Sequence, residues 1–251
     1  MNIKNNNIII YNKMKLINII YFACCNKNEN YKNIINGQLD DIIYYGILKK
    51  AKLYVEFCCE DTKLIPDVIK FFQDKLSNYD YEIKFHTENR YEYYGIKKMY
   101  DLAILEPDKY FIYLQSKAIF NYNINQIYIN ERHNYEKTLT KGTLCDYENI
   151  IKIFNDNPNV MKAGLFPSNV HKQNFIWLNF YWIKGKYLVT CENPIISDNR
   201  YYYETWSETG NNDMTLVYNI YENNYKKYFL NEVGDILNKL NGSFYRGIKV
   251  N

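Results

Sequence analysis

The chain has 251 residues, of which 47% are hydrophobic and 24% are charged, the composition of a protein that folds around a core. Its formal net charge of +3 is small and its lysines are interspersed with acidic residues, so no basic stripe indicates nucleic-acid binding. The first 25 residues contain neither a small-residue cleavage site nor an apolar run of the roughly 18 to 20 residues that a membrane span needs. We therefore predict a protein without a membrane span that is not secreted.

Six cysteines occur as two adjacent pairs and two single residues, namely Cys24-Cys25, Cys58-Cys59, Cys145 and Cys191. They contain no C-x-x-C spacing, so the sequence does not predict a structural zinc site. Adjacent cysteines at strand ends are usually small buried hydrophobic residues. This usage predicts a reduced protein in the cytoplasm.

Strand and helix patterns alternate over the first 118 residues. Strands are predicted at 15–25, 52–59, 81–87 and 109–118, and helices at 39–51, 62–78 and 90–105. Thr62 is a candidate cap for the second of these helices. A β-α-β series of this kind predicts a mainly parallel, Rossmann-like sheet with helices on both faces.

The pattern changes after Ala118. Residues 120–130 are polar and predict a loop, and the segments after it predict a helix within 132–156, a strand at 160–166 and an amphipathic helix near 225–240. No linker rich in Gly, Ser or Pro divides the chain. We therefore predict a ragged tail at 1–14 and a single α/β domain at 15–251 with a mixed C-terminal part.

Ligands of open α/β sheets bind beyond the carboxyl ends of the strands, so the residues there are the first site candidates. None of these ends carries a G-x-G-x-x-G or a P-loop, which argues against a dinucleotide oxidoreductase and a P-loop kinase. Glu60 and Asp61 are candidates for binding the ribose or base of a nucleotide. The alternative is a solvated turn with Asp61 at the start of the next helix. Lys117 is a candidate for neutralising a diphosphate, with a surface lysine as the alternative.

Residues 175–206 are dense in aromatic side chains and do not alternate cleanly with polar ones. The high Tyr count itself follows from the joint excess of Lys, Asn, Ile and Tyr, whose codons are AT-rich. One interpretation is a strand whose aromatic residues pack in the core. Asn179 and Glu204 stand out because a polar group among aromatics needs a partner or a ligand, and a carboxylate there can abstract a proton.

Other catalytic classes have little support in the sequence. His86, His133 and His171 lack metal-ligand spacing and are read as structural, and no Ser-His-Asp or Cys-His arrangement is evident. Glu82-Ile83-Lys84 matches the E-x-K of nucleases, but the motif is weak alone and the near-neutral charge argues against DNA.

The order of these segments resembles a family of glycosyltransferase-like proteins found in bacterial polysaccharide loci and in giant DNA viruses. The resemblance covers about residues 15–210. Its most specific parts are Asn179-Phe180-Tyr181-Trp182 with Tyr187, and Arg200-Tyr201 with Glu204 and Trp206.

The resemblance implies a GT-A-like fold and transfer of a hexosyl or deoxyhexosyl group from a UDP-, GDP- or dTDP-sugar to a glycan or protein acceptor. Residues 15–118 would form the nucleotide-binding half and 119–251 the acceptor-binding half, with Glu204 as general base. We expect the donor to contact Glu60, Asp61, Lys117 and Asn179. We expect the acceptor to contact Trp182, Arg200, Tyr201 and Trp206.

The chain also departs from the family pattern. Gln115-Ser116 replaces His-Thr, Ala118 replaces Gly, and Trp177-Leu178 replaces Ser-Gly. No D-x-D follows a strand to hold Mn or Mg, since Glu106-Pro107-Asp108 precedes one. Either cations such as Lys117 replace the metal, or a carboxylate such as Asp61 helps to bind it, or donor binding is lost. The alternative function is therefore a catalytically degenerate module that binds a glycan or a partner. For a viral protein the expected location is the host cytoplasm or the virion.

Overall fold

The computed structural model describes residues 2–4, 15–25, 31–116, 134–168, 175–199, 201–210 and 216–221. The strands of these ranges form an 8-stranded sheet in the order β1-β4-β3-β2-β5-β7-β6-β8. They are β1 (Asn2–Lys4), β2 (Ile17–Cys24), β3 (Ala51–Cys58), β4 (Tyr81–His86), β5 (Tyr110–Gln115), β6 (Val160–Gly164), β7 (Tyr181–Lys184) and β8 (Leu216–Asn219).

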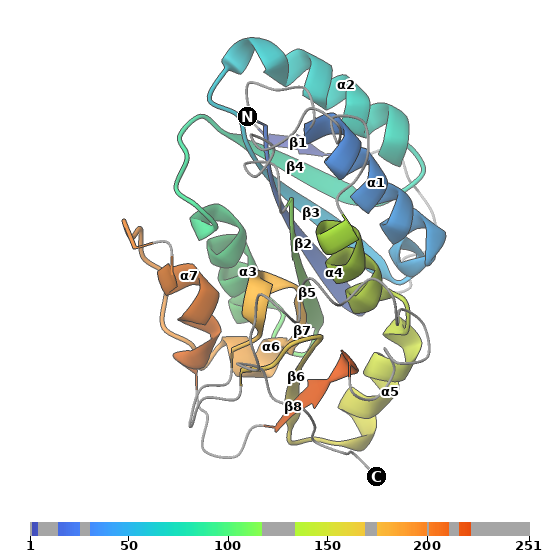
Figure 1. Cartoon of the computed structure of the whole chain (residues 1–251), viewed down its shortest axis with the longest axis vertical. Coiled ribbons are helices and arrows are strands. Elements are labelled where there is room, and N and C mark those ends of the chain that lie inside the picture. Colours follow the sequence, from blue (N-terminus) through green and yellow to red (C-terminus); the bar gives the residue numbers. More distant parts are fainter. Residues whose placement is uncertain are drawn as a thin grey trace.

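The helices are α1 (Tyr31–Tyr44), α2 (Ile65–Leu76), α3 (Tyr93–Leu105), α4 (Asn134–Leu144), α5 (Tyr147–Asp156), α6 (Gly185–Leu188) and α7 (Tyr201–Thr205). Short 3-10 turns are η1 (Ile47–Lys49), η2 (Thr62–Leu64), η4 (Trp177–Asn179) and η5 (Trp206–Glu208). Helix α3 lies on one side of the sheet, and α1, α4 and α5 lie on the other (Figure 1). The prediction that helices cover both faces is therefore confirmed.

The first half of the chain forms the parallel part of the sheet. β2 pairs in parallel with β3 and with β5, and β3 pairs in parallel with β4. All eight residues of β2 are buried, because this strand has a neighbour on each side and helices over both faces. Its continuous apolar run is the pattern from which a buried strand was predicted.

The second half adds a strand of opposite direction. β7 pairs antiparallel with both β5 and β6, and β6 pairs in parallel with β8. Counted along the chain from β2, the sheet reads 3-2-1-4-6-5-7 with the sixth strand reversed. This mixed, mostly parallel sheet flanked by helices confirms the predicted α/β fold class. Because β7 is reversed, its first residue, Tyr181, lies opposite Tyr113 and Gly164 near the carboxyl ends of β5 and β6.

Several element boundaries differ from the prediction. The first helix begins earlier than predicted and ends at Tyr44, because Gly46 adopts a left-handed φ of 70° that closes a helix end. Asp61, not Thr62, caps the turn before α2 by accepting a hydrogen bond from the Lys63 N–H. Residues 132–156 contain two helices, and Asn2–Lys4, expected in a ragged tail, pairs with β4. The loop predicted at 120–130 and the helix predicted near 225–240 lie outside the described residues.

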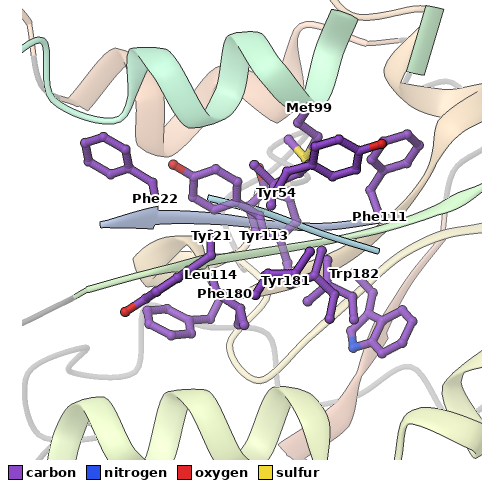
Figure 2. Close-up of a cluster of buried hydrophobic side chains, with 14 of the residues drawn as sticks. Tyr21, Phe22, Tyr54, Met99, Phe111, Tyr113, Leu114, Phe180, Tyr181 and Trp182 are labelled. Carbon is purple, nitrogen blue, oxygen red and sulfur yellow. The ribbon is translucent and has the colours of Figure 1, made fainter. Parts of the chain in front are cut away.

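Aromatic side chains fill both faces of the sheet. Tyr113 and Tyr181 stack with ring centroids 5.6 Å apart, and Figure 2 shows Phe22 and Tyr54 on the α3 side of the strands. Helix α3 approaches closely because Gly95 has no side chain. A Cβ there would lie 2.8 Å from the Tyr113 Oη and 2.9 Å from the Phe22 Cβ. This contact fixes the loop that leads into α3 beside the ends of the strands.

Candidate functional site

The carboxyl ends of β2, β3 and β5 meet where the strand order reverses. β3 and β5 flank β2, so the chain leaves β2 toward one side of the sheet and later returns on the other, which is where open α/β sheets bind ligands. Ser116 joins two of these ends: its Oγ accepts a 3.1 Å hydrogen bond from the Cys24 N–H, and its own N–H donates to the Phe22 carbonyl. We call residues 24–25, 58–61, 86–92, 115–116 and 176–180 the carboxyl edge.

Glu60 and Asp61 follow β3 on this edge, and both are exposed. The Asp61 Oδ1 accepts the Lys63 N–H at 3.1 Å, so the alternative that Asp61 starts the next helical turn is confirmed. Within the described part of the chain, Glu60 forms no hydrogen bond or ion pair. Contact of these two carboxylates with a donor stays a prediction.

A strained turn brings the segment before β7 to the same edge. Leu178 and Asn179 have φ values of 75° and 55°, a left-handed backbone that costs about 1–3 kcal/mol per non-glycine residue. The Gln115 Nε2 donates to the Leu178 carbonyl at 3.0 Å, which ties the turn to the end of β5. Glycine is the residue that this backbone favours, so a leucine at position 178 is strained.

Asn179 connects this turn to α7. Its side chain is 1% exposed, and its Nδ2 donates to the Tyr203 carbonyl at 3.3 Å. The partner that a buried amide requires is therefore a main-chain carbonyl of the helix that contains Glu204. Contact of Asn179 with a donor stays a prediction.

Helix α7 presents Tyr201 and Glu204 to solvent on the same side. Tyr201 is 62% exposed, Glu204 is partly exposed, and residues three apart lie on the same side of a helix. Tyr203 and Trp206 point inward, where the Trp206 Nε1 donates to the Glu192 carbonyl at 2.9 Å. Among the described residues no group forms a hydrogen bond or ion pair with the Glu204 carboxylate. It is therefore available as a base next to an exposed ring.

The two tryptophans expected to contact an acceptor lie in the core. Trp182 is 0% exposed with its Nε1 donating to the Thr143 carbonyl at 2.8 Å, and Trp206 is 1% exposed. Phe180 and Tyr181 are also buried, so the interpretation of this stretch as core packing is confirmed for them. In this structure Trp182 and Trp206 do not reach the surface, and direct acceptor contact by either is not supported. Lys117 and Arg200 lie outside the described residues.

The sequence did not indicate a buried lysine beneath α7. Lys162 of β6 is 0% exposed, its Nζ donates to the Ser207 carbonyl at 2.7 Å, and it lies 4.4 Å from the centroid of the Tyr187 ring. Burial lowers its pKa to about 7. The Tyr187 hydroxyl donates to the same carbonyl at 2.9 Å. Lys162 and Tyr187 therefore hold the turn η5 that directly follows Glu204 and Thr205. The one sequence signal for this contact is Lys162 itself, a charged residue within the apolar strand predicted at 160–166.

His86, read as structural, has a partner that the sequence did not identify. Its Nε2 lies 2.5 Å from the Oε2 of buried Glu56 on β3, and its ring stacks on Tyr94 at 3.6 Å. In the sequence, Glu56 stands out as an acidic residue inside the otherwise apolar strand 51–58. Its pairing with His86 could be predicted only if the register between β3 and β4 were known. The structural role predicted for His86 is consistent with this pairing. His133 and His171 lie outside the described residues.

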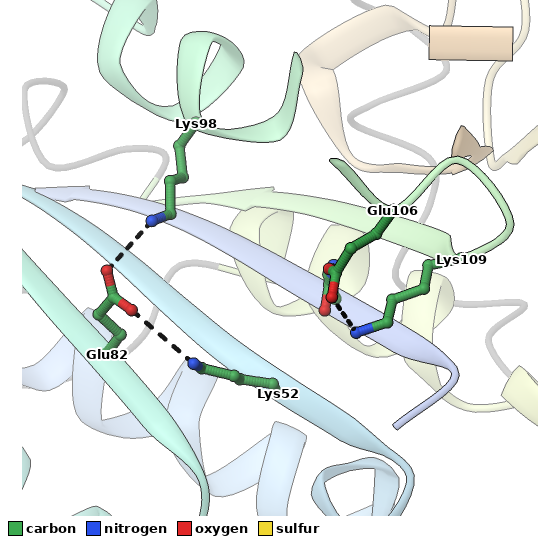
Figure 3. A network of polar contacts seen from close by, with 6 residues as sticks. Lys52, Glu82, Lys98, Glu106 and Lys109 are labelled. Atoms are coloured by element: carbon green, nitrogen blue, oxygen red, sulfur yellow. Dashed lines mark hydrogen bonds and ion pairs between the residues drawn. The ribbon is translucent and has the colours of Figure 1, made fainter. Parts of the chain in front are cut away.

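A second polar cluster lies at the opposite edge of the sheet (Figure 3). We call Asn18, Lys52, Glu82, Lys98, Glu106 and Lys109 the amino edge. Glu82 pairs with Lys98 at 3.1 Å and with Lys52 at 3.7 Å, and Glu106 pairs with Lys109 at 2.7 Å. Burial would raise the pKa of Glu106, but hydrogen bonds from Lys109 and Asn18 outweigh it and hold that pKa below its ordinary value.

The described residues do not provide a metal centre. Over those ranges, no three His, Cys, Asp or Glu side chains gather closely enough to hold a metal ion. Glu106, the first residue of the D-x-D-like Glu106-Pro107-Asp108, lies at the amino edge and accepts hydrogen bonds from Lys109 and Asn18. No described helix is sufficiently long and apolar to traverse a bilayer.

Comparisons with known proteins find a likeness at the level of structure and none at the level of sequence. No protein-family model and no curated protein matches the sequence. Among solved structures, a mannosyltransferase from Pyrobaculum calidifontis, in complex with GDP-Man and Mn²⁺, is similar with a TM-score of 0.37 and 11% sequence identity. The match covers 67% of this chain and 44% of that chain, so the chain spans less than half the length of that protein.

Proposed function

We propose that this protein is a glycosyltransferase that binds a nucleotide sugar at the carboxyl edge and transfers the sugar to an acceptor hydroxyl beside α7. The observation that carries the proposal is the Glu204 carboxylate. It is partly exposed, has no partner among the described residues, and lies on a helix that Asn179 ties to that edge. The GT-A-like strand order and the motif around Leu178 support the same proposal.

The donor would lie across the ends of β2, β3 and β5. Glu60 and Asp61 are exposed acceptors for the hydroxyl groups of a ribose, and the sequence places Lys117 directly after Ser116 for the diphosphate. Asn179 would contact the donor from the strained turn at residues 178–179. The donor nucleotide is a UDP, GDP or dTDP group carrying a hexose or a deoxyhexose.

The acceptor, a glycan or a glycoprotein, would stack against the exposed ring of Tyr201, with Arg200 beside it in sequence. Trp206 supports this region from the core, where its ring packs edge-on against Tyr100 of α3, whereas Trp182 lies on the α4 side of the sheet. The six cysteines form no disulfide, which fits a cytoplasmic protein, in a host cell if the chain is viral.

Glu204 would act as the general base. It accepts the proton of the acceptor hydroxyl while that oxygen bonds to the anomeric carbon and the bond to the nucleoside diphosphate breaks. General bases of this kind contribute about 10²–10⁴ in rate. Because the described residues form no metal cluster, no step is assigned to a divalent ion, and Mn²⁺ or Mg²⁺ is a variable of the test.

The test is calorimetric titration with UDP-, GDP- and dTDP-sugars, followed by donor hydrolysis and transfer assays with and without manganese. We expect one nucleotide class to bind and turn over, and Glu204→Gln to bind it equally but not turn it over. Glu192→Gln, a nearby exposed carboxylate, is the matched control and should retain activity. Failure of every nucleotide sugar to bind overturns the proposal. Binding without turnover by the unmodified protein favours the degenerate binding module.

A further inference from the structure

Two pairs of cysteines lie side by side at the carboxyl edge. Cys24 of β2 is in register with Cys58 of β3, and the Cys25 N–H continues the ladder by donating to the Cys58 carbonyl at 3.0 Å. Cys25 and Cys59, one residue further on each strand, therefore also face each other. Neighbouring strands lie about 4.7–4.9 Å apart, within the roughly 4.4–6.8 Å that separates the Cα atoms of disulfide-bonded cysteines.

The two pairs differ in what their sulfur atoms contact. The Cys24 Sγ lies 3.8 Å from the Ser116 Oγ, and the Cys58 thiol donates to the Glu88 carbonyl at 3.4 Å. These two sulfurs are thus engaged with other groups. In contrast, the Cys59 thiol donates to the Asp61 carbonyl at 3.1 Å, and Cys25 lies close enough to Cys59 for the two thiols to affect each other's pKa.

Access also distinguishes the pairs. Cys24 and Cys58 are both buried, whereas Cys25 is partly exposed and lies beside the buried Cys59 of the neighbouring strand. A small oxidant can therefore reach Cys25 first, with Cys59 beside it to complete the reaction. Burial and the contact with Cys59 raise the pKa of Cys25, so exchange should be slow at neutral pH and faster as the pH rises.

We propose that Cys25 and Cys59 form an oxidisable dithiol that exchanges with a small disulfide of the glutathione type. The Cys25 thiolate attacks one sulfur of the disulfide, which forms a mixed disulfide and releases one glutathione. The Cys59 sulfur then attacks the Cys25 sulfur and releases the second glutathione. The two thiol protons leave with the two glutathione molecules, so the protein loses two hydrogens and gains one S–S bond that joins β2 to β3 beside Glu60.

The experiment exposes the full chain to glutathione disulfide and maps the product by peptide mass spectrometry. We expect a Cys25–Cys59 linkage whose rate of formation increases with pH. Cys59→Ala should stop at a glutathione adduct on Cys25, and Cys25→Ser should form neither adduct nor linkage at this edge. Cys145→Ser and Cys191→Ser are controls that should form the linkage as the unmodified chain does.

A second probe does not depend on oxidation. Phenylarsine oxide binds two adjacent thiols with release of water, so it should bind the unmodified chain and should lose affinity equally for Cys25→Ser and Cys59→Ala. Circular dichroism confirms that each variant is folded. Linkage of Cys24 to Cys58 in place of Cys25 to Cys59, or absence of any linkage in a folded chain, overturns the proposal. Neither result bears on nucleotide-sugar binding.

Discussion

The two edges of the sheet use acidic residues in opposite ways. At the amino edge, Glu82 and Glu106 each have cationic partners within 4 Å, and their side chains are at most 33% exposed. At the carboxyl edge, Glu88 pairs with Arg90, but Glu60 has no ion pair or hydrogen bond among the described residues, and neither does Glu204 on the adjoining α7. The acidic residues of the amino edge thus have cationic partners within the fold, whereas Glu60 and Glu204 have none among the described residues.

The backbone shows the same difference. The described strand starts at the amino edge are regular, whereas the turn at Leu178 and Asn179 has two consecutive left-handed residues. Strain of this kind persists where the surrounding structure imposes it, and it is common at ligand sites. Substitutions at the two edges should therefore have different effects. Those at the amino edge should change the free energy of unfolding, and those at the carboxyl edge should change donor binding and turnover.

The largest effect is expected for Glu204→Gln. Loss of the base should lower the rate of sugar transfer by about 10²–10⁴ while the melting temperature stays unchanged, because the carboxylate has no described partner to lose. Steady-state kinetics and a thermal melt measure the two quantities. A large loss of stability with little loss of turnover would place Glu204 with the amino-edge acids.

Replacing the buried Lys162 beneath η5 tests how this side chain contributes to the pH dependence of stability. The pKa of Lys162 is lowered from 10.5 to about 7, so between those values the unfolded chain binds more protons than the folded chain. Stability should therefore rise with pH over this window, by up to about 1.4 kcal/mol per pH unit from this group. Lys162→Met should remove that part of the slope in urea unfolding curves recorded across the window.

Lys184→Met is the matched control for this measurement. Lys184 is also buried on a neighbouring strand, but its Nζ donates to the Phe154 carbonyl at 2.7 Å and so supports the end of α5 instead of η5. Burial lowers the pKa of Lys184 to about 8, so the pH range over which this group changes the stability is narrower than that of Lys162. An unchanged slope in Lys162→Met would show that Lys162 does not titrate between the two states.

Glu82→Gln should reduce stability without changing turnover. It leaves Lys52 and Lys98 without their carboxylate in a partly buried setting, for which a loss of about 1–3 kcal/mol lies between the values for surface and buried pairs. Glu148→Gln breaks an exposed pair with Lys50 and should leave the urea midpoint unchanged. Equal midpoints for the two variants would contradict a structural role for the amino edge.

The smallest effect is expected at Asp61, where capping and binding can be separated. Asp61→Ala removes the hydrogen bond to the Lys63 N–H and should cost about 1 kcal/mol of stability. Asp61→Asn retains a capping oxygen and removes only the charge, so it should weaken donor affinity with little change in stability. Calorimetry measures the donor affinity of each variant, and urea unfolding measures its stability. If both variants and the unmodified protein bind the donor with the same affinity, Asp61 is not part of the donor site.

The strands could be predicted because the burial of a strand is visible in its own sequence pattern. Ile17–Cys24 is an apolar run and Tyr81–His86 alternates, and both signals survive without knowledge of the neighbouring strand. The end of α1 was also readable, since Gly46 is the residue that a left-handed helix end favours, but it was counted as a helical position.

The contacts within the site could not be predicted in the same way. Glu56 meets His86, and Asn179 meets Tyr203, only through the register of strands and the path of the chain between them. Lys162 and Lys184 look like surface residues by type, and their partners are main-chain carbonyls that carry no residue identity. The sequence therefore indicated Asn179 and Glu204 as unusual, but it could not show that Asn179 bonds to the Tyr203 carbonyl while Glu204 has no partner within the described ranges.

The reversed direction of β7 affects how this protein can change over evolutionary time. Since β7 runs opposite to its neighbours, the segment before it opens on the same side as the segments after β2, β3, β4, β5 and β6. Insertions or deletions in any of these connections leave every strand and its hydrogen bonds intact. Differences in length among related chains should therefore collect on this side, where they alter which molecules are recognised while the sheet is inherited unchanged.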